Sequence, residues 1–296
     1  MIKADPLDFA PPLLRIQEKP PAPLAGWKRR RKCRRPERTP PMRNTLAIAH
    51  KELRSYFASP IGYIVLGFFA LLYGWFFVTM LNYFVRQSMQ VAQFGGNEAM
   101  NVNQVMLRPL LQNVTILLLF LMPMVTMRSY AEEKRSGTIE LLLTSPLKDW
   151  EIILGKFLGA LALWALALLI SLIHIAILFR FGNPEWKPIA TAYLGLLLMG
   201  GCFISVGLLI SSLTNNQIIA GMATFGVFLL LWVVNWIGSF SGPTVDRITQ
   251  YLSIIDHFDD FAKGIVDTSH LIYYISFISF GLFLTAKSVD SERWRG

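Results

Sequence analysis

The feature that most constrains this chain is a series of six apolar segments, each close to 20 residues long and almost free of charged side chains. A helix needs about 20 residues to cross a bilayer, and it satisfies its own backbone hydrogen bonds while doing so. With 53% apolar and only 16% charged residues, the chain does not have the composition of an ordinary soluble enzyme. The sequence therefore predicts an all-α membrane protein with six transmembrane helices, at about residues 61–81, 107–127, 157–179, 191–213, 218–238 and 270–287.

The distribution of Lys and Arg predicts the orientation. Six spans place both termini on one side of the membrane, and cytoplasmic segments carry an excess of Lys and Arg. If the termini are inside, 22 of the 28 Lys and Arg residues lie inside and 6 lie outside. The sequence thus indicates a multi-pass membrane protein with both termini in the cytoplasm.

Residues 1–41 form a tail of a different character. They hold nine of the sixteen prolines and the run KRRRKCRRPER, and they have no periodic apolar face. We expect this basic tail to be disordered, with Met42 as a second candidate for the initiator and 42–290 as the membrane domain. Next to six predicted spans, the basic run favours topogenic charge or anionic lipid over nucleic acid as its partner.

A short amphipathic helix is expected between the tail and the first span. Residues Arg43–Ser59 place apolar side chains on one helical stripe, and Pro60 should end the helix because proline has no amide donor. Such a helix is suited to lying in the membrane surface. The stripe consists of Leu46, Ala49, Leu53, Tyr56 and Phe57.

The predicted inner loop Arg128–Lys156 is the most informative segment. Charges of both signs alternate over Glu132–Arg135, Gly137 breaks the run, and a second amphipathic piece ends at Pro146. Two interpretations fit this pattern. The loop either docks another protein at the cytosolic face or solvates itself through its own salt bridges.

Part of this loop, EEKRSGTIELLLTSPLKDWEIILGK, resembles the cytoplasmic coupling segment of ABC-2 type transporter permeases. In that family an E-x-x-x-G-T-x-E-x-L-L pattern precedes a Pro and a G-K that opens the third helix. A second stretch, YLSIIDHFDDFAKGIVDTSHLIYY, is similar to the segment before the last helix in the gliding-motility and nitrous-oxide-reductase-maturation branch. The resemblance covers about residues 42–290, and the first motif matches at Glu133, Gly137, Thr138, Glu140, Leu142, Leu143, Pro146, Gly155 and Lys156.

The resemblance implies a specific architecture and set of partners. It implies six spans, an elbow helix at 43–59, a cytoplasmic coupling helix, short helices that dip into the membrane before the last span, and a homodimer or heterodimer of permeases. ATP would be hydrolysed by a separate cytosolic ABC ATPase, so this chain is expected to be no enzyme and to need no cofactor. The sequence agrees, since its one Gly-Lys pair, at Gly155 and Lys156, lacks the other residues of a phosphate-binding loop. The residues expected to couple to the ATPase are Glu133, Gly137, Thr138, Glu140, Leu142, Leu143 and Pro146.

Polar residues elsewhere give weaker signals. Asp256, His257 and Asp260 could ligate a divalent metal, but their spacing also fits an ordinary amphipathic helix, and no metal site is predicted. His174, Asn113 and Asn235 lie within predicted spans and are candidates for lining a substrate path.

Two rival functions remain at this level. Ser171 and His174 are one helical turn apart, which raises an intramembrane hydrolase, although no acidic residue in that span and no nucleophile-elbow motif accompany them. The other rival keeps the ATPase but has the complex transmit force or a signal across the membrane without moving a solute. The sequence favours the permease.

Overall fold

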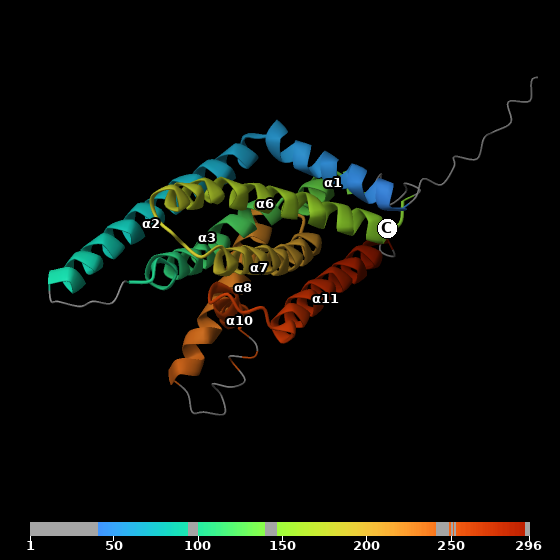
Figure 1. Ribbon diagram of the computed structural model, residues 1–296. Coiled ribbons are helices and arrows are strands. Elements are labelled where there is room, and N and C mark those ends of the chain that lie inside the picture. Colours follow the sequence, from blue (N-terminus) through green and yellow to red (C-terminus); the bar gives the residue numbers. More distant parts are fainter. Residues whose placement is uncertain are drawn as a thin grey trace, which may run out of the picture. The chain divides into compact units, whose positions relative to one another are not determined.

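The computed structural model describes residues 41–93, 100–139, 147–240, 249, 251 and 253–293, with the backbone alone at 41, 234–240 and 293. All of them belong to one unit, Thr39–Gly296. Every regular element in this described part is a helix (Figure 1). The helices are α1 (Pro41–Ala58), α2 (Pro60–Gln93), the π-helix η1 (Asn103–Leu107), α3 (Arg108–Thr126), α4 (Ala131–Arg135), α6 (Asp149–Phe181), α7 (Trp186–Leu213), α8 (Gln217–Phe240), α10 (Ile254–Ala262) and α11 (Thr268–Arg293).

Five helical stretches are long and apolar enough to cross a membrane, which confirms the predicted all-α membrane class. They are α2, the continuous stretch Asn103–Arg135 that contains α3, and α6, α7 and α11. The predicted span 218–238 falls on α8, of which Gln217–Val233, the part with described side chains, is apolar. Several helices extend past the predicted boundaries, because helix continues into the polar residues that flank an apolar core.

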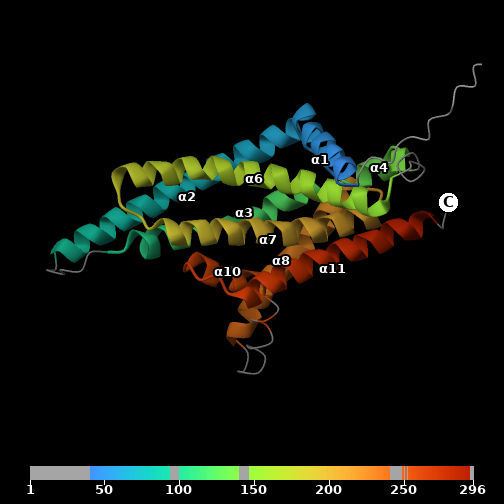
Figure 2. The ribbon, with the colours of Figure 1, turned by 45° about the vertical axis from the view of Figure 1, so that its right-hand side comes forward.

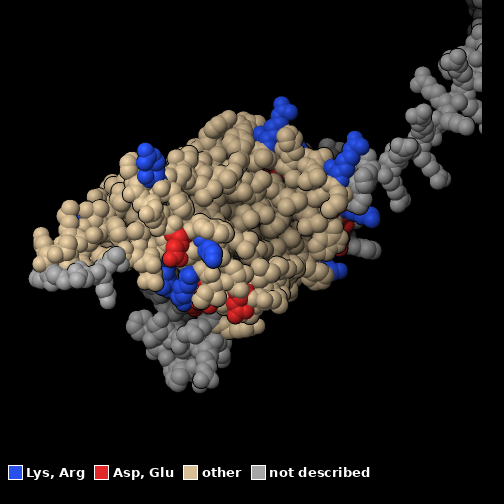
Figure 3. Space-filling view, in the orientation of Figure 1, with Lys and Arg blue, Asp and Glu red and all other residues tan. Residues whose placement is uncertain are grey.

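Central and peripheral helices differ in burial. In α3 and α7, 67% of the most apolar window is buried, against 22–33% in α2, α6 and α11. The outer helices expose large apolar side chains such as Trp75, Ile173 and Phe280, each at least 60% accessible. Such surface is costly in water but not in lipid. The face in Figure 3 is correspondingly mostly uncharged, with its charged side chains along the edges and in one group, and the chain is a multi-pass membrane protein.

The corner between α1 and α2 follows directly from the sequence. The predicted helix 43–59 is present, and it ends at Ala58 because Pro60 cannot continue the hydrogen-bond ladder. A Cβ atom on Gly62 would lie 2.7 Å from the carbonyl oxygen of Tyr56. Only glycine therefore allows the first turn of α2 to fold back this closely on α1.

The most extensive contact of α1 is with α6. The two helices cross closely where Gly155 and Gly159 face α1, since a Cβ there would come within 2.6 Å of Ile48 and 2.7 Å of Glu52. The stripe predicted for α1 is not buried as a unit, because Tyr56 is buried while Leu46 is exposed. The side of α1 that meets α6 is thus rotated from that stripe and includes a carboxylate.

Two ends of the helical unit matter for function. The α4 end consists of α1, α4, the first turns of α6 and the last turns of α11, which lie together in both ribbon views (Figures 1 and 2). The α10 end consists of α10, η1, and the first turns of α3, α7 and α11. Hydrogen bonds from Asn103 to Glu185 and from Thr191 to Phe261 hold the α10 end together.

Candidate functional site

The predicted coupling segment begins in α4. The backbone N–H groups of Tyr130 and Ala131, at the start of this short helix, donate to the Ser211 hydroxyl of α7 at 3.1 and 3.2 Å. Gly137 then breaks the helix in the left-handed region, with φ of 71°, as the sequence predicts. The structure describes three of the predicted coupling residues, Glu133, Gly137 and Thr138. The other four, Glu140, Leu142, Leu143 and Pro146, lie outside the described residues.

A buried lysine lies at the centre of the α4 end. The Lys156 ammonium, whose side chain is 2% exposed, pairs with Glu133 Oε1 at 2.7 Å and with Glu52 Oε1 at 3.0 Å. It also donates to the carbonyl oxygen of Ser129 at 2.8 Å and lies 5.0 Å from the Tyr130 ring centroid. One side chain of α6 thereby contacts α1, α4 and the turn before α4.

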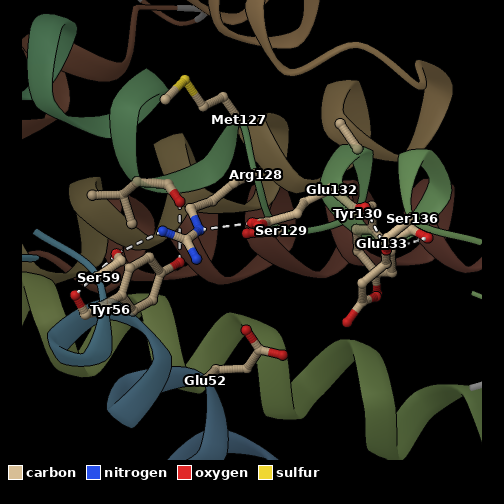
Figure 4. Close-up of polar contacts among 12 residues, drawn as sticks. Glu52, Tyr56, Ser59, Met127, Arg128, Ser129, Tyr130, Glu132, Glu133 and Ser136 are labelled. Atoms are coloured by element: carbon tan, nitrogen blue, oxygen red, sulfur yellow. Dashed lines mark hydrogen bonds and ion pairs between the residues drawn. The ribbon is translucent and has the colours of Figure 1, made fainter. Parts of the chain in front are cut away.

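A second cation, Arg128, joins the same turn to the α1–α2 corner (Figure 4). Its guanidinium pairs with Glu132 at 3.0 Å and donates to the Ser59 hydroxyl at 2.8 Å. It also lies 6.0 Å from the Tyr56 ring, whose hydroxyl donates to the carbonyl oxygen of Val125 at 3.0 Å. The corner predicted from Pro60 is thus attached to the end of α3.

The α4 helix is also tied to the end of the chain's last helix. Lys134, with 4% of its side chain exposed, pairs with Glu292 of α11 at 2.7 Å. Together with the Ser211 contacts, this pair connects α4 to α7 and α11 on the side away from Lys156. A displacement of α4 would consequently act on most of the helices at this end.

A cavity of about 500 Å³ opens between α1, α4 and α6. It is lined by three carboxylates and three cationic side chains, so its lining is polar without a net charge of either sign. The charged residues of the lining are Lys51, Glu52, Arg128, Glu132, Glu133 and Lys156.

The ion pairs at the α10 end are more open to solvent. Arg108 donates to both oxygens of Asp259 at 2.6 and 2.9 Å, and Gln112 donates to the same carboxylate at 2.7 Å. Burial raises the pKa of Asp259, but hydrogen bonds from Lys263 and Arg108 lower it by more, so the pKa lies below its usual value. Lys263 also pairs with Asp260, and that hydrogen bond lowers the pKa of Asp260. Figure 3 shows these acidic and basic side chains gathered near α10.

Two histidines extend this cluster towards α11. His257 Nε2 lies 3.1 Å from the carbonyl oxygen of Tyr251, which can only accept, so His257 donates there. The Nδ1 atoms of His257 and His270 lie 2.6 Å apart, so one of them donates to the other, while His270 Nε2 faces Asp260 at 2.9 Å. Both rings line a second cavity of about 590 Å³. Two of the weak metal candidates, His257 and Asp260, are thus hydrogen-bonded to His270, and no metal-holding group of three such side chains occurs in the described part of the chain.

The polar residues in the middle of the spans do not form a nucleophilic site. Ser171 Oγ donates to the carbonyl oxygen of Leu168 at 2.7 Å, and the Tyr193 hydroxyl lies 2.6 Å away, so the serine hydrogen is engaged within the helix. His174 instead packs against the rings of Tyr73 and Phe77, with centroids 5.3 and 5.2 Å apart. This geometry lacks the serine-to-histidine hydrogen bond that an intramembrane hydrolase requires.

Comparison with known proteins places these helices in a family. The model for "ABC-2 family transporter protein" matches residues 46–286, most of the chain. The chain belongs to this ABC-2 family. The predicted resemblance to ABC-2 type permeases is therefore confirmed.

Individual members of the ABC-2 family match over part of their length. The chain is 31% identical to "Probable multidrug ABC transporter permease YbhR" of Escherichia coli K12 over 147 residues, which cover 48% of this chain and 38% of YbhR. It is 30% identical to "Probable ABC transporter permease protein NosY" of Pseudomonas aeruginosa over 162 residues, 50% of this chain and 59% of NosY. The matched stretch thus spans between about two fifths and three fifths of the length of these relatives.

Within this ABC-2 chain, the substrate-path candidates lie on three different helices. His174 lies on α6 against α2, and a half-buried Asn113 lies on α3. Asn235 lies on α8, where the backbone alone is described. These positions remain predictions.

The sequence did not single out several residues that organise the α4 end. Glu52, Arg128 and Tyr56 have local patterns that fit a solvated amphipathic helix or loop equally well. Lys156 carried a detectable signal, because a lysine two turns into an apolar helix is costly unless it is paired. The identity of its partners could not be read from the sequence, because they lie 23 and 104 residues away.

Proposed function

We propose that this chain is the permease subunit of an ATP-binding cassette transporter in the bacterial inner membrane. The permease domain comprises residues 42–290, outside which 1–41 form a basic tail. Six spans, provided by α2, α3, α6, α7, α8 and α11, place both termini in the cytoplasm, with α1 as the elbow helix in the membrane surface. Two such permeases pair, and a cytosolic ABC ATPase hydrolyses the ATP that moves a substrate.

The observation that best supports this proposal is the attachment of α4. The segment that resembles a coupling helix begins in α4, whose ion pairs run to α11 and, through Lys156 of α6, to α1. A load applied by an ATPase to residues 132–146 would reach several spanning helices at once. Rigid displacement of packed helices is an established route to alternating exposure of a site.

The test is the substitution Glu140→Lys. A carboxylate that meets a basic groove and is partly desolvated contributes more than an exposed one, and its reversal leaves the partner's charge unpaired, at about 2–5 kcal/mol of association. We expect the variant to insert normally but to retain less ATPase in co-purification and to stimulate it less. Glu133→Lys should weaken recruitment less, because Glu133 is already paired within the chain.

Glu185→Lys, on an exposed residue at the α10 end, is the matched control with the same charge change. If the Glu140→Lys variant recruits and stimulates the ATPase as well as the wild-type chain does, the coupling role of the loop is contradicted. Stimulation of the ATPase without movement of any solute in sealed vesicles would instead favour a complex that transmits force or a signal.

A further inference from the structure

The helix α4 reaches α1 and α6 through side chains rather than through helix packing. Its closest backbone neighbours are α7 and α8. Towards α1 and α6 lies the cavity of about 500 Å³ that all three helices line. A movement of α4 cannot be passed across open space by van der Waals contact, so a bonded link must carry it.

Lys156 has the geometry of such a link. An ammonium has three N–H donors, and here the three nearest acceptors are Glu133 Oε1, Glu52 Oε1 and the carbonyl oxygen of Ser129. They come from α4, α1 and the turn before α4, whereas Lys156 itself belongs to α6. Because all three donors are engaged and the side chain is enclosed, a displacement of one segment strains the bonds to the others.

We propose that Lys156 is a positioning residue for coupling, which holds α1, α4 and α6 together so that a displacement of α4 moves α6 and α1. This inference rests on the proposed function, because it assigns the route by which an ATPase at the coupling segment acts on the spans. The link does not touch the substrate or the ATPase.

The charge balance explains why this link depends on Lys156, because the other cation near Glu52, Lys51 at 3.9 Å, is exposed and belongs to α1 itself. Two carboxylates share one buried ammonium, and the second oxygen of Glu133, Oε2, is buried without a hydrogen-bond partner. Without the ammonium, Glu52 and Glu133 would repel each other across the cavity, and α1 would separate from α4. Arg128 provides another tie from α4, but it ends on Ser59 rather than on α6.

The experiment measures the link directly and then its effect on coupling. Spin labels at His50→Cys and Arg135→Cys, two exposed positions, with Cys33→Ser, report the distance between α1 and α4 in the purified full chain. We expect a narrow distance distribution in the labelled chain that keeps Lys156, and a broad distribution in the labelled chain with Lys156→Met. In complexes with the ATPase that co-purifies with the wild-type chain, Lys156→Met should keep recruitment but lower stimulation about tenfold, within the range of ordinary coupling free energies.

Two further variants separate positioning from mere stability. The exchange Glu133→Lys with Lys156→Glu keeps the same charges at the same place and should restore both the narrow distribution and part of the stimulation. Lys134→Met removes the buried lysine of α4 itself, which pairs with α11, and should leave the α1–α4 distance unchanged. If Lys156→Met does not fold, Glu133→Gln, which weakens the same link without removing the cation, takes its place.

A narrow distribution together with wild-type stimulation in Lys156→Met would overturn the proposal, as would a broad distribution with wild-type stimulation. If the wild-type chain recruits no ATPase, the proposed function fails, and the distance measurement still decides whether Lys156 holds the helices together.

Discussion

The α4 end and the α10 end both carry ion pairs between segments far apart in the sequence, but they differ in enclosure. At the α4 end the cations Lys156 and Lys134 are almost completely buried, whereas at the α10 end Arg108 and Lys263 remain 34–39% exposed. The α10 pairs that involve Lys263 are also local, within one turn of helix. Buried pairs are expensive to break, and exposed pairs contribute little. The α4 end is therefore built to move as a unit, and the α10 end can adjust.

The first prediction tests which end faces which compartment, and its outcome is all or none. The Lys and Arg bias predicts that a reporter active only in the periplasm is silent when fused after Gly296 and active when fused after Gly96. A reporter active only in the cytoplasm should give the opposite pattern. Periplasmic activity at Gly296 would overturn the six-span topology and reverse the assignment of the two ends.

The second prediction concerns the enclosed lysine. Lys156→Met should lower the free energy of unfolding by about 3–5 kcal/mol, because it leaves two carboxylates without their shared cation. Thermal unfolding of the purified chain in detergent measures this as a loss of melting temperature. A loss as small as that of a surface substitution would show that the α4 end is not more tightly held than the α10 end.

The third prediction concerns the close crossing of α1 and α6. Gly159→Leu should cost about 1–3 kcal/mol, because the new side chain meets Glu52 and the backbone of Ala49 where no space exists. Gly226→Leu, at a position whose Cβ would meet nothing within 4 Å, is the matched control. Equal melting temperatures for the two variants would contradict the close approach of α1 to α6.

The comparison of the two ends also shows what the sequence could and could not predict. Five membrane-spanning helices, the break at Pro60 and the turn at Gly137 were predictable, because hydropathy, proline and glycine act locally. The role of Lys156 was not, because the partner of a buried charge depends on which helices meet. The hydrogen bond between His257 and His270 was also missed, since the helical spacing of α10 gave no indication that α11 folds back against it.

The fourth prediction concerns pH at the α10 end. Burial lowers the pKa of His257 from its usual 6.5, and the Tyr251 carbonyl and nearby carboxylates offset this only in part. Near pH 6.5 the unfolded chain therefore binds a proton at this histidine more readily than the folded chain does. The contribution of His257 to stability is thus present above pH 6.5 and is lost as the pH falls. The melting temperature should decrease between about pH 7.5 and 5.5, and less so in His257→Gln. An identical decrease in both proteins would remove His257 as the cause.

The smallest expected effect is that of Lys263→Met, the same substitution as at Lys156 but at the other end. Lys263 pairs with Asp259 at 2.7 Å and with Asp260 at 2.9 Å, yet its side chain is 39% exposed and its partners have other donors. Arg108 and Gln112 still bind Asp259, and the Asp260 side chain is 35% exposed to water, so neither carboxylate is left without a donor. The loss should be about 0–1 kcal/mol and should shrink in high salt, because exposed charges are screened. A destabilisation as large as that of Lys156→Met would mean that enclosure does not separate the two ends.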